Sequence, residues 1–494
     1  MQTPSFCVLS KEIFQKSLEF GQTAVNALKK SVSPYNFVEH AKKELKSAGF
    51  LQIYESDPWN LEQGKKYFYT RNNSCIIAFN IGKKFNPEES CFKIIGAHTD
   101  SPSLRIAPNS YNPSGEIERY NVQYYGGGLW FTWLDRDLSL AGKVIFKDNE
   151  GKLTSKIIQV EEPIFFIPNC PPHLKSGSER ESLTINKESH LKPLIATLKV
   201  NNILDEEENE KEKKECKDKK LGKTLRKIIL KELNKGLEKN VIDSGDQIVD
   251  YDLALYDTQS PSLIGLNKEF LASGRLDNLG SSIPALYSMI NASKEELVAE
   301  QTSINIIALF DNEEIGSMTY QGADSNFFLM HLKRIFSQSL NITKTPFSED
   351  LYLRFMAKSY VISADLAHAY NPNYSEKFQS QHQNKVQQGV VLKINCNGRY
   401  STESENAAVF KELGKLCNVP IQEFIVRQDS PCGTTIGPIT SAKIGIKSVD
   451  VGIAQFAMHS IREQLGIVDL YYYKTIFEEF FKSYEKVKGN ILKE

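Results

Sequence analysis

The spacing of apolar and polar positions predicts two amphipathic helices near the start of the chain, followed by a β-hairpin. Apolar residues recur at helical spacing through residues 10–50. The pattern breaks at Ser33-Pro34, where a proline can begin a helix but cannot continue one. Residues 66–81 change to strand-like composition around Asn72-Asn73, which is typical of a tight turn between paired strands.

Short apolar runs that end abruptly in polar groups predict buried, parallel strands. A strand covered on both faces shows no polar alternation, and strands that alternate with helices favour a sheet with helices on both faces. The runs are residues 92–97, 304–310 and 360–364, and they lead into His98, Asp311 and Asp365, respectively. Since parallel strands end at the same edge of a sheet, we predict a mixed, mostly parallel α/β fold with its chemistry at that edge.

Residues 104–252 differ from the rest and predict a β-rich insertion. Glycines 126–128 precede alternating strands but lack the G-x-G-x-x-G spacing of a nucleotide cradle. A dense mixed-charge run at 205–220 has too few apolar residues to order itself and is predicted to be a disordered or solvated loop. The chain is thus divided into a discontinuous main domain, 1–103 and 253–494, and an inserted domain, 104–252.

Composition favours a cytoplasmic enzyme. The chain is 40% hydrophobic and 24% charged with a net charge of −1, which gives no electrostatic argument for a nucleic-acid or anionic-membrane partner. It has no apolar run long enough to span a bilayer, and its first residues lack a signal-peptide core. The eight cysteines are scattered without a C-x-x-C pair, so neither a disulfide framework nor a cysteine-type zinc site is indicated.

Each candidate for chemistry has a structural alternative. In the His98-x-Asp100 pair an imidazole can bind a metal while the carboxylate fixes its tautomer, although a lone surface histidine near a turn is an alternative. Asp277 lies at a predicted helix start, where capping is its alternative role. In the pair Glu313-Glu314 one carboxylate can bind a metal and the other accept a proton, but acidic turns are often only solvated.

Taken together, these residues are two imidazoles and several carboxylates at strand ends or in loops. The set is His98, Asp277, Glu313, Glu314, Asp365 and His459. It fits a site for two divalent cations with one shared carboxylate. Mixed nitrogen and oxygen donors without thiolates suit Zn²⁺, with Mn²⁺ or Co²⁺ as substitutes. Two such ions can activate one water and polarise a carbonyl together.

The same motifs make the sequence resemble the aspartyl aminopeptidase family of dinuclear zinc metallopeptidases. The matching stretches are GAHTDSP (96–102), RLDNLGSS (275–282), DNEEIGS (311–317), ISADLAHAYNPNY (362–374), RQDSPCGTTIGPI (427–439) and AMHSIRE (457–463). They follow the family order and cover the chain from about residue 10 to residue 485. The resemblance implies an α/β peptidase domain that carries an inserted, β-rich dimerisation domain.

The resemblance also implies a role for each candidate. His98 and Asp365 would bind one zinc ion, and Glu314 and His459 would bind the other. Asp277 would bridge the two ions. Glu313 would be the general base for the water that bridges the zinc ions, and Asp100 would orient His98.

The implied activity is removal of N-terminal aspartate or glutamate from peptides with a free N-terminus. Lys393 and Tyr400 would line the pocket for the acidic side chain, although a strand lysine that faces solvent is the alternative for Lys393. Family members form homo-dodecamers built from dimers, in which His173 would reach a neighbouring subunit's site. Three alternatives stay open: a vacuolar-type enzyme that prefers neutral residues (with vacuolar or lysosomal delivery), a non-catalytic scaffold or cargo, and a carboxypeptidase or deacylase.

Overall fold

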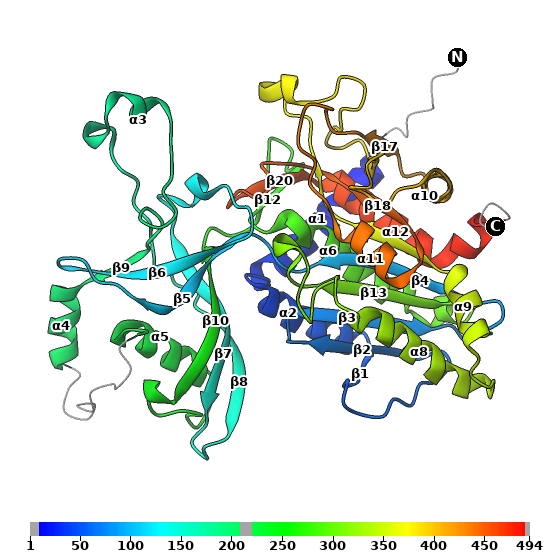
Figure 1. Cartoon of the computed structure of the whole chain (residues 1–494), viewed down its shortest axis with the longest axis horizontal. Coiled ribbons are helices and arrows are strands. Elements are labelled where there is room, and N and C mark those ends of the chain that lie inside the picture. The colour runs from blue at the N-terminus through cyan, green and yellow to red at the C-terminus, as the bar shows by residue number, and fades with distance from the viewer. Residues whose placement is uncertain (1–8, 208–219, 490–494) are drawn as a thin grey trace. The chain divides into compact units, whose positions relative to one another are not determined.

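The computed structural model describes residues 9–207 and 220–489 of the 494-residue chain, so residues 208–219 of the predicted charged loop lie outside the described residues. The chain forms two compact units (Figure 1). Unit 1 consists of Met1–Ser101, Pro261–Met458 and Glu463–Glu494, and unit 2 of Pro102–Ser260 and His459–Arg462. The predicted boundary after residue 252 falls inside strand β10 (Ile248–Asp257), which belongs to unit 2 along its whole length.

Unit 1 is built on a nine-stranded sheet. Its strands, in spatial order, are β1 (Leu51–Gln52), β2 (Lys66–Arg71), β3 (Cys75–Ile81), β13 (Ile304–Phe310), β4 (Phe92–His98), β14 (Tyr360–Ala364), β18 (Lys447–Gly452), β16 (Val390–Lys393) and β17 (Ile421–Phe424). The four neighbours β13, β4, β14 and β18 are parallel, whereas β3 and β16 pair antiparallel with them. The predicted mixed, mostly parallel sheet is confirmed.

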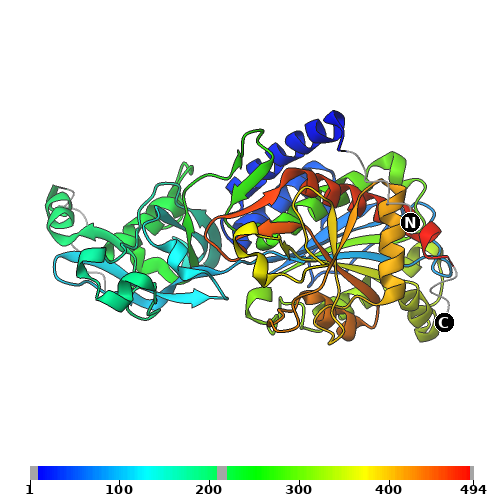
Figure 2. The same cartoon turned by 90° about the horizontal axis from the view of Figure 1, so that it is seen from above.

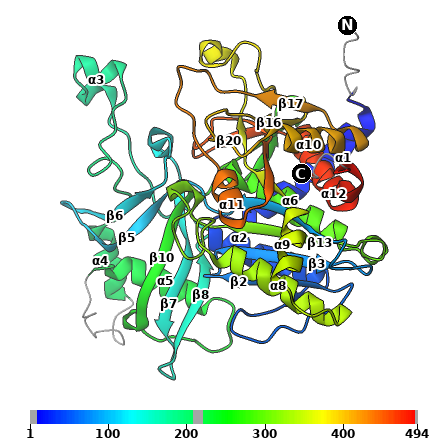
Figure 3. The same ribbon diagram turned by 45° about the vertical axis from the view of Figure 1, so that its right-hand side comes forward.

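Helices cover both faces of this sheet because its central strands are apolar on both sides. In β13, Ile307 and Leu309 pack into one core while Ile306 and Phe310 pack into the opposite one. The helices of the first core are α1 (Lys11–Lys30), α2 (Pro34–Ser47), α6 (Leu276–Ala292), α10 (Ser404–Leu416) and α12 (Ile467–Val487). The helices of the second are α8 (Phe327–Thr343), α9 (Glu349–Ala357) and α11 (Ile436–Ile444), of which α8 and α9 are seen in Figure 3.

The start of the chain follows the predicted pattern. Helices α1 and α2 are separated at the predicted break, where the Ser33 side chain accepts a hydrogen bond from the backbone N–H of Asn36 and Pro34 begins α2. The hairpin β2–β3 turns at Asn72 and Asn73, which both have positive φ. Helix α1 lies against α12 from the other end of the chain (Figure 2).

A five-stranded sheet in unit 1 changes one prediction. Its strands, in order, are β11 (Ser262–Ile264), β12 (Phe270–Ser273), β20 (Glu463–Gly466), β19 (Ala454–Phe456) and β15 (Ala367–His368). The sequence pattern predicts a helix that opens at Leu271 and runs through Met289, but residues 270–273 form β12 and α6 begins only at Leu276. Antiparallel pairing of β12 with β20 places Ser273 opposite Glu463 and overrides the local pattern.

Unit 2 is a six-stranded sheet with its own core. The strands, in order, are β8 (Leu153–Gln159), β7 (Leu138–Lys147), β10, β5 (Ser103–Tyr111), β6 (Ile117–Tyr125) and β9 (Leu194–Thr197). The sequence pattern predicts a helix from residue 224, which is α5 (Lys223–Asn234), and a strand over 190–200, of which residues 194–197 form β9. Helix α4 (Leu198–Glu207) follows, so residues 198–200 are helical and not strand, and residues 205–207 are helical where the charged loop is predicted. In the part of the chain that the structure describes, no helix combines the length and apolar character needed to cross a membrane.

Candidate metal centre

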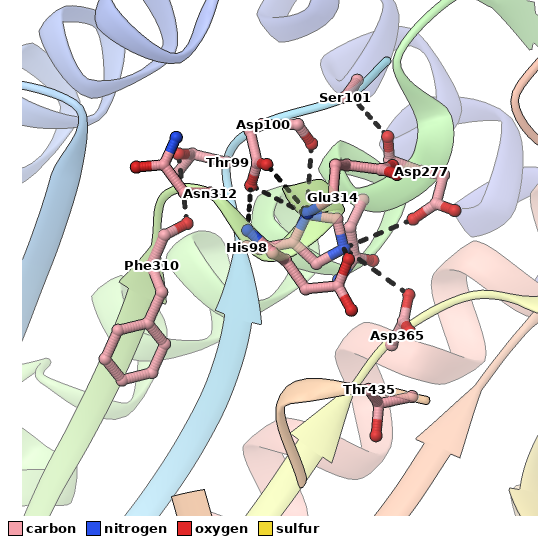
Figure 4. Close-up of polar contacts among 12 residues, drawn as sticks. His98, Thr99, Asp100, Ser101, Asp277, Phe310, Asn312, Glu314, Asp365 and Thr435 are labelled. Carbon is pink, nitrogen blue, oxygen red and sulfur yellow. Dashed lines mark hydrogen bonds and ion pairs between the residues drawn. The ribbon is translucent and has the colours of Figure 1, made fainter. Parts of the chain in front are cut away.

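The ends of three parallel strands bring the predicted side chains together in unit 1. In register, the last residue of β13, Phe310, lies opposite His98, the last residue of β4, and β14 runs on the other side of β4. Asp365 directly follows β14, and Glu313 and Glu314 form the short helix η4 (Glu313–Ile315) just after β13. Parallel neighbours end at one edge, so these groups converge there (Figure 4).

The imidazole of His98 is the centre of this cluster. Its Nδ1 lies 3.1 Å from the carbonyl oxygen of Asp100 and 3.3 Å from Asp100 Oδ1, so Nδ1 carries the proton and donates it. Its Nε2 faces three carboxylates, with Asp277 Oδ1 at 3.4 Å, Asp365 Oδ1 at 3.7 Å and Glu313 Oε2 at 3.8 Å. Nε2 is therefore the nitrogen placed to bind a metal.

Asp100 connects His98 to the acidic turn. Its carboxylate is fully buried and accepts the backbone N–H of Glu313 at Oδ1 and that of Glu314 at Oδ2, both at 3.1 Å. These are N–H groups at the start of a helix, which have no partner within the helix itself. One buried carboxylate thus fixes both the ring of His98 and the turn that carries the two glutamates.

Asp277 is held through its backbone at the start of α6. Glu463 Oε2 accepts the N–H of Leu276 at 2.6 Å and the N–H of Asp277 at 3.2 Å. The Ser101 hydroxyl donates to the carbonyl oxygen of Asp277 (Figure 4). Asp277 and Asn278 have non-helical backbone angles, so the regular turns of α6 begin after them, and the N–H groups of Leu276 and Asp277 are bound by the carboxylate of Glu463. The side chain of Asp277 faces His98.

Several carboxylates lie close together around the buried imidazole of His98. Burial lowers the pKa of His98, but Glu313 and the carboxylates of Asp100, Asp277 and Asp365 more than offset this and raise that pKa well above its ordinary value. Burial also raises the pKa of Glu313 to about 8, with His98 opposing the shift and the neighbouring carboxylates adding to it. A divalent cation in the cluster would offset this repulsion between carboxylates.

The donor set fits zinc. One ligand atom each from His98, Asp277 and Asp365 lie within 4.8 Å of one another. Zinc bonds to nitrogen and oxygen of about 2.0–2.2 Å in a tetrahedron place two ligand atoms about 3.4 Å apart. The separations of Nε2 from Asp277 and Asp365, 3.4 and 3.7 Å, are close to that value. The arrangement therefore suits one ion held by these three residues.

Lys393 and Tyr400 lie next to the cluster. Lys393 ends β16 and is 3% exposed, so the alternative of a solvent-facing strand lysine is wrong. Its Nζ is 3.4 Å from Asp365 Oδ2 and lies over the ring of Tyr400, 5.5 Å from the centroid. Burial raises the pKa of Tyr400, which keeps its phenol neutral. The ammonium thus sits between the proposed metal ligand and an aromatic wall.

A cavity of about 330 Å³ in unit 1 contains residues that the sequence reasoning did not single out as functional. His368, which follows Asp365 by three positions, lines it together with Phe424 and Met458, and the cationic side chains of Lys377 and Arg427 also line it. The signal for His368 was present, since this residue is part of the ISADLAHAYNPNY stretch. The cavity combines apolar, neutral polar and cationic side chains.

The two remaining predicted histidines belong to unit 2. His459 Nδ1 lies 3.0 Å from the carbonyl oxygen of Gly127, so Nδ1 donates and Nε2 is the ring nitrogen that keeps its lone pair for a metal. His173 lies in the short helix η2 (Pro172–Leu174) and its side chain is exposed. The metal-binding role of His459 and the role of His173 at a neighbouring subunit's site both stay predictions.

The sequence is similar to zinc aminopeptidases over most of its length. The family model of the aminopeptidase I zinc metalloproteases (M18) matches residues 27–481. The probable aspartyl aminopeptidase of Ricinus communis is 39% identical over 482 residues, which are 94% of this chain and 96% of that protein.

Solved structures share the fold over nearly the whole chain. The Ape4 chain of a cryo-EM complex with Nbr1 has a TM-score of 0.90 at 35% identity, covering 98% of this chain and 89% of that one. The mApe1 dodecamer of Saccharomyces cerevisiae has a TM-score of 0.79 at 26% identity, covering 95% of this chain and 98% of its own.

Proposed function

Because the chain belongs to the M18 family of aminopeptidase I zinc metalloproteases, we propose that it removes an N-terminal aspartate or glutamate from peptides. The protein is a metallo-aminopeptidase, and the preference for acidic residues is the proposed part. One observation carries the proposal: the buried ammonium of Lys393 lies 3.4 Å from Asp365, beside the group formed by His98, Asp277 and Asp365. The aspartyl aminopeptidases to which the chain is similar support the same preference.

We propose two zinc ions in each subunit, with Mn²⁺ or Co²⁺ as possible substitutes. His98 and Asp365 would hold one ion, Glu314 and His459 the other, and Asp277 would be shared. When bound, the zinc ions would supply Lewis-acid polarisation of the peptide carbonyl and a water of lowered pKa.

The protein's own part in the proposed reaction is to move a proton and to hold the reacting groups. Glu313 lies just after β13, with its carboxylate 3.8 Å from His98 Nε2. Its side chain is mostly buried, which limits the access of bulk water to the carboxylate. We assign it the transfer of a proton from the attacking water to the departing amino group. Asp100 keeps His98 in one tautomer and fixes the backbone of Glu313, which keeps the base and the ligand in register.

Selectivity for acidic residues would arise from Lys393. A buried ammonium forms a charge-assisted hydrogen bond to a substrate carboxylate that it cannot form to a neutral side chain. The ring of Tyr400, over which the ammonium lies, would form one wall of this subsite. The cavity lined by His368 and Phe424 offers room for the rest of a peptide substrate.

Assembly and location are further parts of the proposal. The mApe1 dodecamer to which this chain is similar supports a homo-dodecamer built from dimers, in which His173 would reach a neighbouring subunit's site. Light scattering would then give a mass near twelve times 55.9 kDa. Free thiols among the described residues, at Cys75, Cys91, Cys170, Cys396, Cys417 and Cys432, are typical of a reducing compartment and support a cytoplasmic location.

Hydrolysis of a panel of dipeptides tests the proposed function. The panel holds Asp, Glu and Leu at a free N-terminus, the same peptides with an acetylated N-terminus, and each is assayed with and without a chelator. We expect chelator-sensitive release of Asp and Glu from unblocked peptides only. Faster release of Leu would indicate a neutral-preferring enzyme, cleavage of blocked peptides a carboxypeptidase or deacylase, and no hydrolysis with zinc present a scaffold.

A further inference from the structure

Glu463 is a buried carboxylate to which neither the proposed reaction nor the proposed ligand set assigns a role. It is the first residue of β20, it is 2% exposed, and it lies directly opposite Ser273 at the end of β12. The chain passes from Ser273 through Arg275 into α6, which carries Asp277 near its start. The pairing of these two strands therefore places the carboxylate of Glu463 at the beginning of that helix.

A single oxygen of Glu463 holds the backbone on the N-terminal side of Asp277. Oε2 accepts the N–H of Leu276 at 2.6 Å and the N–H of Asp277 at 3.2 Å. Hydrogen bonds to a charged acceptor are shorter and stronger than those between neutral groups. The backbone of Asp277 is thus fixed by a strand that follows it by 186 positions in the sequence.

Other hydrogen bonds connect the same segment to the strand ends of the candidate centre. On the C-terminal side of Asp277, Ser101 donates to its carbonyl oxygen. The next residue, Asn278, donates from Nδ2 to the carbonyl oxygen of Ala364 at 2.8 Å, and Ala364 immediately precedes Asp365. Glu463 is the charged member of this group of anchors, and it alone among them holds the N–H of Asp277.

We propose that Glu463 is a positioning residue that sets the place of Asp277 in the metal centre. The inference rests on the proposed function, since it assumes that Asp277 binds zinc. Glu463 itself touches neither metal nor substrate in this role. Its carboxylate fixes the backbone from which the Asp277 side chain extends toward His98, 3.4 Å away. If Glu463 served only to cap α6, its loss would lower the stability of the fold and leave zinc affinity unchanged.

Two conservative substitutions separate placement from charge. E463Q keeps the length of the side chain and an acceptor oxygen but removes the charge, whereas E463D keeps the charge and shortens the side chain by one methylene. We expect E463D to bind Zn²⁺ about 10- to 100-fold more weakly than wild type, the usual cost of losing a group that orients a ligand. E463Q should bind Zn²⁺ at least about fivefold more tightly than E463D, because it still reaches the two N–H groups.

Competition of the intact chain with a chromophoric chelator measures Zn²⁺ affinity, and visible absorption of the Co²⁺ form reports the ligand geometry. Glu485 provides the matched control, since its carboxylate pairs with the buried Lys93 at 3.1 Å elsewhere in unit 1. E485D and E485Q should bind Zn²⁺ like wild type even where they lower stability.

Wild-type Zn²⁺ affinity and an unchanged Co²⁺ spectrum in E463D would overturn the inference while leaving the proposed function intact. E463Q that binds as weakly as E463D would also overturn it, since charge and not placement would then be decisive. A wild-type chain that binds no Zn²⁺ and hydrolyses no peptide would overturn the proposed function itself.

Discussion

Substitution of Asp100 by asparagine tests how the centre is held together. Oδ1 of Asp100 accepts the N–H of Glu313 and faces Nδ1 of His98, whereas Oδ2 accepts the N–H of Glu314. Asparagine has the same shape but replaces one oxygen by an NH₂ group, which cannot accept a hydrogen bond. We expect the amide to turn its oxygen toward the two donors on the Oδ1 side, so the N–H of Glu314 loses its acceptor.

The magnitude follows from that single loss. A hydrogen bond to a charged acceptor contributes about 1.5–3 kcal/mol, and a buried donor left without an acceptor costs a similar amount. At about 1.4 kcal/mol for each factor of ten, the loss corresponds to a decrease of about 10- to 150-fold. The decrease should appear in kcat and in zinc affinity, because the affected backbone carries the base Glu313 and the proposed ligand Glu314. KM should change by less than about threefold, since Asp100 is assigned no contact with substrate.

Steady-state kinetics on an Asp-terminated dipeptide at saturating zinc, together with zinc competition and urea unfolding, would measure these quantities. The matched control is D469N, since the buried carboxylate of Asp469 accepts the N–H of Gly389 at 2.7 Å and that of Gln387 at 2.6 Å. D469N should lose a similar amount of unfolding free energy while keeping its kcat. If D100N kept the wild-type kcat and zinc affinity, or if D469N lost as much activity as D100N, the reasoning would be refuted.

Three further outcomes follow from the site. E313Q should keep its zinc content and lose about 100- to 10,000-fold in kcat, because glutamine cannot accept the proton; near wild-type turnover would remove the assignment as base. K393M should lower kcat/KM for Asp-terminated peptides about 10- to 100-fold more than for Leu-terminated ones; equal losses would contradict a subsite for carboxylates. In the zinc-free site, burial lowers the pKa of His98, but the surrounding carboxylates raise it by more, so this pKa lies well above its ordinary value. Zinc requires the neutral ring, so affinity should rise with pH and calorimetry in two buffers should detect proton release; binding without proton release between about pH 6 and pH 8 would oppose this.

The local pattern of apolar and polar residues correctly predicted those helices and strands whose signals lie within a few consecutive residues. The break at Ser33-Pro34 is the boundary between α1 and α2, and the apolar run that ends at Phe310 is a fully buried strand. A proline restricts its own backbone, and an unbroken apolar run has no polar side to expose to water, so both signals act over a few residues. The same logic located His98 and Asp365 at strand ends.

Pairing between distant strands was beyond local pattern. Residues 271–273 belong to a stretch that predicts a helix, but they fold as part of β12, which pairs with β11 just before it and with β20 almost two hundred residues later. Residues 198–200 read as strand and begin α4 instead. In both places the local preference for helix or strand is weak, and one of the two strands that pair with β12, β20, is absent from the local sequence.

The sequence by itself determined which residue types this protein could use: two imidazoles and a set of carboxylates after apolar runs, in the order of a zinc peptidase family. Only the tertiary structure decided which oxygen faces which nitrogen. It turned Lys393 inward against Asp365, gave the carboxylate of Asp100 to the backbone of Glu313 and Glu314, and placed Glu463 beneath Asp277. Composition and spacing specify which residues can act as donors and which are buried. A hydrogen bond between residues far apart in the chain forms only after strand pairing has brought those residues together.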